Sequence, residues 1–189
     1  MTLIRTAGPA VEPVTLAGMK EHLRVTHDSE DALITGLIKA AREEVERGTS
    51  LALIEQTWRL TLDRWPPGRV VPLRRNPVLS VTSVMVFDED GEGWLVAPEA
   101  YRLDRASMPA RLHFIDARPS GRRLNGIEID FSAGYGPDGE GVPEALKRAM
   151  GILVSHWFEF RGAYGAKDQP VSIPDAYLRI IAGFRTPRL

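Results

Sequence analysis

The residues of this chain that could bind a metal or catalyse a reaction are few and widely separated. His156 and Glu159 lie three positions apart in a predicted helix, so both could reach one metal ion. A metal site needs three or four ligands, and the sequence places no further histidine or carboxylate beside this pair. A partly buried, hydrogen-bonded histidine is the better interpretation of His156, and we expect no metal site.

Nucleophilic and phosphate-binding motifs are not supported either. Ser107, Ser120 and Ser132 lack the G-x-S-x-G setting that exposes a nucleophile on a tight turn. The glycine-rich stretch 133–141 lacks the Gly-Lys-Ser/Thr ending of a phosphate-binding loop and the register of a dinucleotide-binding turn. Its glycines are better explained by a turn between a strand and a helix. We expect no catalytic residue, no cofactor and no enzymatic activity.

Two kinds of charged segment stand out between residues 69 and 123. The acidic run Asp88, Glu89, Asp90 and Glu92 lacks the spaced ligands and closing glutamate of a calcium loop, so a solvated hairpin tip is favoured. Two arginine clusters flank turns and could contact phosphates: Arg69, Arg74, Arg75 and Arg118, Arg122, Arg123. No aromatic ladder lies between them to stack bases, and solvated loops are the simpler interpretation. A small nucleic-acid-binding module that uses these clusters is the alternative function, and a protein contact is a third interpretation of the clusters.

The composition is that of an ordinary globular protein. The chain has 189 residues, 43% hydrophobic and 26% charged, with a net charge of −1 that gives no general attraction to nucleic acid or anionic membrane. It has no cysteine, which excludes a disulfide framework and a thiol nucleophile. No apolar run approaches the length of a membrane span, and the first residues do not resemble a signal peptide. We expect a soluble protein made in the cytosol.

Two pairs of predicted helices lie toward the two ends of the chain. The first pair is a short helix capped by Thr15 and a longer helix that Asp28 or Ser29 caps and Gly48 ends. The second pair begins at Pro143 and Pro174, and Gly162 ends its first member. Each helix carries an apolar stripe at helical period, so each needs a partner that covers this stripe.

Between the helical pairs, short segments rich in β-branched and aromatic residues are typical of strands. Turn residues separate them, and they lie at 57–62, 70–73, 81–87, 94–96, 101–103, 112–115 and 127–131. We predict an α+β fold that is one structural unit. In it, residues 1–54 and 142–189 form a four-helix core from two N-terminal and two C-terminal helices, and residues 55–141 form an inserted small antiparallel β section.

The end of the chain has an unusual composition for its position. Phe184, Pro187 and Leu189 are apolar, and Arg185 and Arg188 lie between them. Chain ends are usually polar and disordered. An apolar, basic segment directly after a helix suits docking on a neighbouring protein, and folding back on its own domain is an equally good interpretation.

Several short motifs, in their order and spacing, resemble the tailed-phage head–tail connector (adaptor) proteins across nearly the whole chain. The opening of the family is matched by Pro13-Val14-Thr15-Leu16, Lys20, His22-Leu23-Arg24-Val25, Asp28, Asp31, Leu33-Ile34 and Ala40-Ala41-Arg42. Its first strand is matched by Gln56-Thr57-Trp58 and Leu62-Asp63-Arg64-Trp65-Pro66. Later matches are Pro77-Val78, Ser80-Val81, Ala133-Gly134-Tyr135-Gly136, Val142-Pro143 and His156-Trp157-Phe158-Glu159.

The resemblance implies a structural protein without catalytic residues. Such adaptors form a ring, usually of twelve subunits, beneath the portal, and they join the capsid to the stopper or tail while DNA passes through the hole. Similar proteins occur in phage-derived gene transfer agents, so the implied location is the neck of a virion or gene transfer agent particle made in a bacterial cytoplasm. The implied partners are other copies of the chain, the portal protein and a stopper or tail-completion protein. DNA is implied to pass through the channel without sequence-specific binding, and no membrane is implied.

The resemblance also suggests roles for the two unusual surface segments. We expect the terminal residues Phe184, Arg185, Pro187, Arg188 and Leu189 to bind the portal. We expect the acidic residues Asp88, Glu89, Asp90 and Glu92 to face the tail-side partner or a neighbouring subunit.

Overall fold

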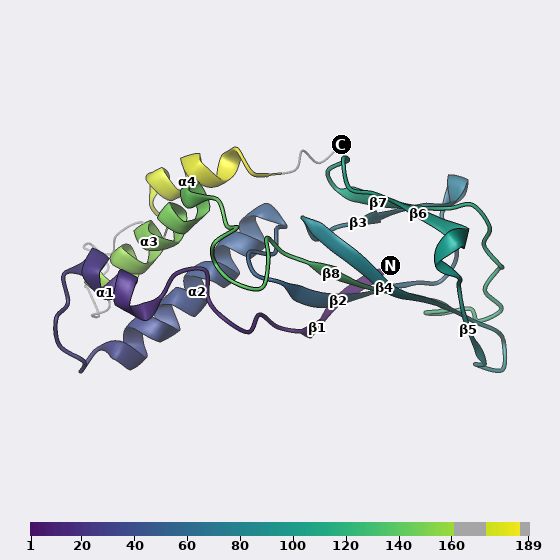
Figure 1. The fold of residues 1–189 in the computed structure, drawn as a ribbon, viewed down its shortest axis with the longest axis horizontal. Helices are drawn as coiled ribbons and strands as arrows, with labels where there is room; N and C mark the ends of the chain where they lie inside the picture. The colour runs from purple at the N-terminus through teal and green to yellow at the C-terminus, as the bar shows by residue number, and fades with distance from the viewer. Residues whose placement is uncertain (161–172, 186–189) are drawn as a thin grey trace, which may run out of the picture. The chain divides into compact units, whose positions relative to one another are not determined.

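The computed structural model describes residues 1–160 and 173–185, which form two compact units (Figure 1). Met1–Ala10 and Glu55–Tyr135 make up the β unit, and Val11–Ile54 and Gly136–Leu189 make up the helical unit. Residues 1–10, predicted above to belong to the helical core, lie in the β unit because they contain a strand that pairs with its sheet. The α+β fold class is confirmed by the described helices and antiparallel sheets.

The β unit contains two antiparallel sheets. The five-stranded sheet has the order β1 (Thr2–Ala7), β2 (Gln56–Leu62), β8 (Ile127–Ala133), β4 (Val78–Phe87) and β5 (Gly93–Leu95). The three-stranded sheet has the order β3 (Val70–Leu73), β7 (Ala110–Phe114) and β6 (Tyr101–Asp104). Short 3₁₀ turns, η1 (Pro67–Arg69) and η2 (Pro98–Ala100), precede β3 and β6.

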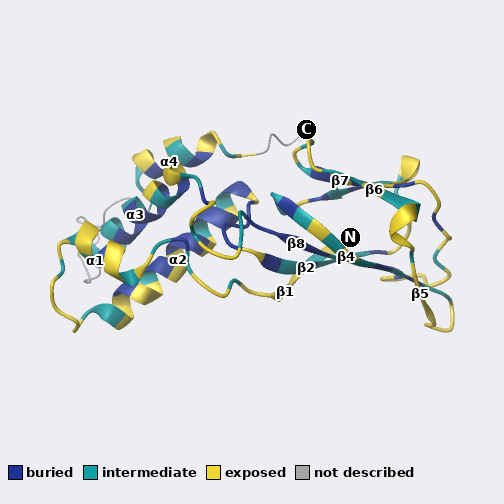
Figure 2. Ribbon diagram, viewed as in Figure 1, coloured by how far each residue is buried: buried dark blue, intermediate teal, exposed yellow. Residues whose placement is uncertain are grey.

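The core of the β unit follows from alternation along its strands. In β2 and in the first five residues of β8 every second side chain is buried, including Leu60 and Ile129, and the residues between them are partly exposed. At the end of β8, Ser132 is buried as well. In β7, Leu112 and Phe114 are buried in the same alternating way (Figure 2). The buried sides of the strands therefore form one apolar core, and the other side of the five-stranded sheet carries polar residues.

Strand β1 was not predicted. It is short, five of its six residues are exposed, and it has no apolar alternation to mark it. Pairing with β2, in which Leu3 lies opposite Leu60, is what makes the segment a strand. The predicted strands at 57–62, 81–87 and 127–131 correspond to β2, β4 and β8 within three residues.

The helical unit contains α1 (Leu16–Leu23), α2 (Asp31–Thr49), α3 (Glu144–Glu159) and α4 (Asp175–Ala182). Helix α2 contacts each of the other three, and α3 also contacts α1 and α4. Gly48 allows a close approach of α4, because a Cβ there would lie 3.1 Å from Cδ1 of Ile181.

The helix ends differ in detail from the predicted ones. Thr15 caps α1 as predicted, since its Oγ1 accepts a hydrogen bond from Gly18 N at 3.1 Å. Asp28 and Ser29 do not cap α2: Asp28 accepts a bond from Lys20 Nζ at 2.6 Å, and Ser29 Oγ lies 2.7 Å from Nδ1 of His27. Gly48 lies within α2, which ends where Ser50 adopts a left-handed φ of 62°. Residue 162 lies outside the described residues.

A buried charge cluster joins the start of the helical unit to α2. Arg42 is 1% exposed, its Nε donates to Glu12 at 2.7 Å, and its Nη1 donates to Glu46 at 3.0 Å. Burial alone would lower the pKa of Arg42. The hydrogen bond to Glu12 and the nearby carboxylates raise the pKa by more than burial lowers it, so it lies above its usual value. Glu46 also accepts a bond from Leu53 N at 2.9 Å, so the cluster holds the chain before and after α2.

The turn between β6 and β7 holds a second carboxylate with strong partners. Asp104 accepts a hydrogen bond from Ser107 Oγ at 2.7 Å and from Arg111 Nη2 at 2.6 Å. These two bonds lower the pKa of Asp104 from 3.8 to about 2. Because the folded-state pKa is depressed, this carboxylate stabilises the fold above pH 4, and the contribution disappears as the pH falls through 3.8 to about 2.

We predict that Arg42→Ala lowers the free energy of unfolding by about 3 kcal/mol or more, because it leaves buried carboxylates without their cation. Arg47→Ala is the matched control on the same helix, since the Arg47 side chain is 72% exposed in its pair with Glu44. The control should cost less than about 1 kcal/mol. Urea unfolding of both variants checks this, and equal losses would contradict the role given to the Arg42 cluster.

We predict that Asp104→Asn has a lower urea midpoint than the parent protein at pH 7. The gap between the two midpoints should narrow as the pH falls from 4 to 2. Ser107→Ala keeps the Asp104 carboxylate but removes the hydrogen bond that Ser107 Oγ donates to it. This change should raise the pKa of Asp104 toward 3.8. Unfolding curves at several pH values measure both effects. If the stability of the parent and that of Asp104→Asn change with pH in the same way, the Asp104 carboxylate does not make the pH-dependent contribution described above.

Candidate interaction surfaces

The acidic run forms the tip of the hairpin between β4 and β5. The Asp88 carboxylate is used internally: its Oδ1 accepts hydrogen bonds from Asp90 N at 3.0 Å and Glu92 N at 2.8 Å. The side chains of Glu89, Asp90 and Glu92 are exposed. Three of the four predicted contact residues are therefore presented to solvent on an ordered turn, and Asp88 shapes that turn.

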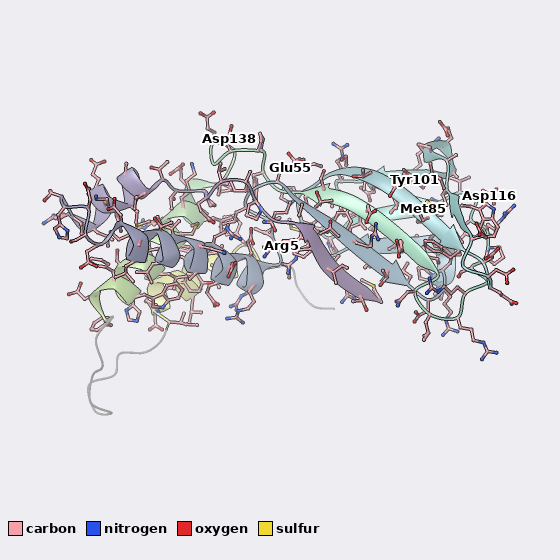
Figure 3. All side chains as sticks on the ribbon, turned by 90° about the horizontal axis from the view of Figure 1, so that it is seen from below. Arg5, Glu55, Met85, Tyr101, Asp116 and Asp138 are labelled. Atoms are coloured by element: carbon pink, nitrogen blue, oxygen red, sulfur yellow. The ribbon has the colours of Figure 1, made fainter. Side chains whose placement is uncertain are left out.

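One arginine cluster lies beside this tip, on the loop 115–126. The loop is tied to the end of β4, since Gly121 N donates to Phe87 O at 3.1 Å and Phe87 N donates to Gly126 O at 2.8 Å. A Cβ on Gly121 would lie 2.8 Å from Glu89 N, so the two backbones approach as closely as glycine allows. Asp116, in this loop, lies at one end of the β unit (Figure 3).

Aromatic and aliphatic side chains are exposed next to these charges. The Arg118 guanidinium lies 4.8 Å from the centre of the Trp94 ring. Trp94 is 38% exposed, and Leu95, Ile115 and Leu124 are between 54% and 69% exposed. Residues 89–95 together with the loop 115–126 are called the tip surface below. It combines both charge signs with Trp, Arg and Leu, which is the chemistry of a protein contact.

The other arginine cluster is divided between the two ends of β3. Arg69 precedes the strand and donates to Ile115 O at 3.3 Å, so it lies with the loop 115–126. Arg74 and Arg75 follow the strand, and the Arg75 guanidinium lies 4.6 Å from the centre of the Trp58 ring. The two clusters therefore do not form one continuous basic stripe.

The predicted docking segment at the chain end is described only in part. Phe184 is half-buried and Arg185 is exposed, while Pro187, Arg188 and Leu189 lie outside the described residues. The helix before them is anchored by Tyr177, which is buried and donates its hydroxyl to Glu44 O at 3.3 Å. Burial raises the pKa of Tyr177 to about 12, so its hydroxyl stays protonated and can donate at neutral pH.

The serines and the histidine considered for catalysis have other partners. Besides the Ser107–Asp104 bond, Ser120 Oγ donates to Arg122 O at 3.1 Å and Ser132 Oγ lies 3.0 Å from Ser80 Oγ. The His156 ring packs on Phe160 with 5.0 Å between ring centres. Within residues 1–160 and 173–185, no three His, Asp or Glu side chains are grouped so that they could hold a metal ion.

The glycine-rich stretch acts as a connection with a close backbone contact. A Cβ on Gly139 would lie 2.6 Å from Pro13 O, so the loop packs against the segment that leads into α1. None of the helices in the described parts of the chain is both long and apolar enough to cross a membrane.

Comparison with known proteins gives two agreeing results. The family described as "Phage gp6-like head-tail connector protein" matches residues 13–84. A chain of the "Neck of native GTA particle computed with C12 symmetry" is 30% identical, with a TM-score of 0.76, over 100% of this chain and 97% of that chain. No curated protein sequence matches significantly.

Two further solved structures contain chains of the same fold. A chain of the "Virion of native gene transfer agent (GTA) particle" is 29% identical with a TM-score of 0.82. A chain of the "Neck of empty GTA particle computed with C6 symmetry" is 28% identical with the same TM-score of 0.82. Both alignments cover 100% of this chain and 97% of the other. The fold is that of a component of phage-like particles, and the chain belongs to the head–tail connector family.

Proposed function

We propose that this protein is a structural adaptor in the neck of a phage or gene transfer agent particle. It forms a ring beneath the portal, joins the capsid to the stopper or tail, and leaves a channel through which DNA passes. The observation that carries the proposal is the full-length match to a neck chain at 30% identity. Both units of the fold take part in that match, since it covers 100% of this chain.

We propose a ring of twelve copies, by analogy with the neck of that relative, which was computed with C12 symmetry. Neighbouring copies in a ring meet through two different faces, a head-to-tail contact. Such a contact can be weak between two free subunits and still close when the portal supplies a template, because the remaining contacts then form at high local concentration.

Two surfaces are assigned partners in this proposal. The segment 184–189 docks on the portal, because an exposed Arg185 follows the half-buried Phe184 at the end of an anchored helix. The acidic residues of the tip surface contact the tail-side partner or a neighbouring subunit. In both places charged groups lie beside apolar ones, and such pairing supplies orientation as well as affinity.

The adaptor role requires no catalysis, and the serines and histidine considered above have structural partners. The alternative of a nucleic-acid-binding module has less support, because Arg74 and Arg75 are separated from the loop 115–126. In addition, Arg75 and Arg118 already cover tryptophan rings. A net charge of −1 also disfavours strong binding to naked DNA.

The function is tested by measuring mass with light scattering after gel filtration, with and without the cognate portal protein. We expect about one copy of this chain per portal subunit in the complex and no salt-dependent binding to naked DNA. A chain that ends at Gly183 should lose the portal complex while its urea unfolding curve stays unchanged. DNA binding without portal binding would favour the nucleic-acid alternative. Undiminished portal binding by the shortened chain would show that residues 184–189 are not the portal-binding segment.

We predict that the combined change Glu89→Lys, Asp90→Lys and Glu92→Lys blocks tail joining without unfolding the protein, because all three side chains are exposed. Asp88 is kept, since it shapes the turn. The matched control reverses three exposed carboxylates elsewhere, Glu21, Glu55 and Glu140. Electron microscopy of particles assembled with each variant counts the tailed fraction; normal tailed particles with the tip variant would refute the assignment.

A further inference from the structure

The strand edges of the two sheets differ in how they are protected. An unpaired edge exposes a row of N–H and C=O groups that can pair with another chain, and proteins usually block it with proline or charge. In the three-stranded sheet, edge strand β3 contains Pro72, which cannot donate to a further strand. At the other edge, Nη1 of Arg102 in β6 donates to Tyr101 O at 3.1 Å and to Glu99 O at 3.3 Å. Both edges of that sheet are therefore blocked.

The five-stranded sheet lacks such protection at both of its edges. β1 forms one edge and contains no proline (Figure 3). Its single charge, Arg5, reaches back toward Oε1 of Gln56 at 3.5 Å. At the other edge β5 pairs only with Met85, Val86 and Phe87, and Val84 O accepts a bond from Val96 N. Among the described residues, nothing pairs with the outer side of β4 from Val78 to Ser83, which contains neither proline nor charge.

The exposure of β1 indicates that a partner is missing from the isolated chain. Five of its six residues are exposed, and Ile4 is 49% exposed. A strand held only by one neighbour and exposed on both faces gains little from packing. The open stretch of β4 is about as long as β1. Both strands carry register shifts in their existing pairing, between Arg5 and Ala7 in β1 and at two places between Val78 and Ser83 in β4, so the two edges could pair over the regular parts of this length.

The direction of the strands fits pairing between copies. From one open edge to the other the order is β1, β2, β8, β4, and every adjacent pair is antiparallel. With this even number of strands, β1 and β4 run in opposite directions. A second copy placed edge to edge in the same orientation therefore presents its β1 antiparallel to β4 of the first. Neighbours in a ring are related by rotation about the ring axis, which keeps that orientation.

We propose that the five-stranded sheet continues from copy to copy around the ring, with the β1 edge of one copy pairing antiparallel with residues 78–83 of β4 in the next. The inference rests on the proposed ring and names the contact between its subunits. The β1 edge and the β4 edge are the two different faces that a head-to-tail interface needs. Main-chain hydrogen bonds between the edges would supply much of the contact.

Disulfide cross-linking tests the contact, because the chain has no cysteine of its own. Protein with Ile4→Cys is mixed with size-tagged protein that carries one of Leu79→Cys, Ser80→Cys, Val81→Cys, Thr82→Cys or Ser83→Cys. Each mixture is assembled on the cognate portal and oxidised. Opposite residues of antiparallel strands lie about 4.5–5.5 Å apart at Cα, within the range that a disulfide needs. All five positions are scanned because the β4–β8 register shifts between Val78 and Ser80 and again between Val81 and Ser83.

We expect the mixed dimer to peak at one position of β4 and to fall sharply at its neighbours, since side chains of a strand alternate between faces. The matched control pairs Ile4→Cys with Arg111→Cys, which is exposed on the three-stranded sheet and should give only background dimer. Unfolding curves of the cysteine variants verify that each variant folds with the stability of the parent.

Three results would overturn the proposal, and they are distinguishable from one another. Background cross-linking at all five positions, in a sample whose mass shows that the ring has formed, removes the strand contact but leaves the adaptor role intact. Dimers joined through Ile4→Cys in both copies would show two-fold pairing of β1 instead. If no ring forms on the portal, the proposed function itself fails, and the inter-subunit sheet fails with it.

Discussion

The fold of the β unit depends on the register of β8 between β2 and β4. These strands are far apart in the chain, and a slip of one residue would turn every core side chain toward solvent. On the polar side of the sheet, Arg59 of β2 binds both carboxylate oxygens of Asp130 in β8 at 2.7 and 2.8 Å. Ser83 of β4 donates to the same carboxylate at 3.1 Å. A single side chain thus joins all three central strands in the register that buries Leu60 and Ile129 on the opposite side.

Because the core uses one side of the sheet, the surfaces that we propose for partners lie at loop ends, strand edges and the chain terminus. The loop 115–126 and the β4–β5 turn are separate in the chain, but hydrogen bonds to Phe87 hold them side by side, and together they carry charges of both signs. The Arg42 cluster, by contrast, is buried and internal to the helical unit. This division separates groups that stabilise the fold from exposed groups that are available to partners, and it suits the proposed adaptor role.

The sequence predicts the α+β class, the helices and the central strands because these carry regular apolar patterns. It does not predict β1, whose six residues become a strand only through pairing with β2. The helix cap at Thr15 is local and is predicted correctly, whereas Asp28 is taken by Lys20, a partner from the preceding helix. The acidic tip and the neighbouring Trp94 are evident from the sequence, but their closeness to Arg118 depends on tertiary contacts that no local pattern encodes. The full docking segment at the chain end is untested, since residues 186–189 lie outside the described part of the chain.

Each unit is built from two separated stretches of the chain, and this interleaving affects synthesis on the ribosome. β1 and β2 are translated early, but β8, which β2 and β4 both require, is not available until residue 133 has emerged. Likewise α2 must wait for α3, which begins at Glu144. Such long-range pairing delays folding until most of the chain is made. Nascent chains on one polysome therefore cannot display a complete five-stranded sheet to each other until β8 has emerged, which shortens the period in which premature association through its edges can occur.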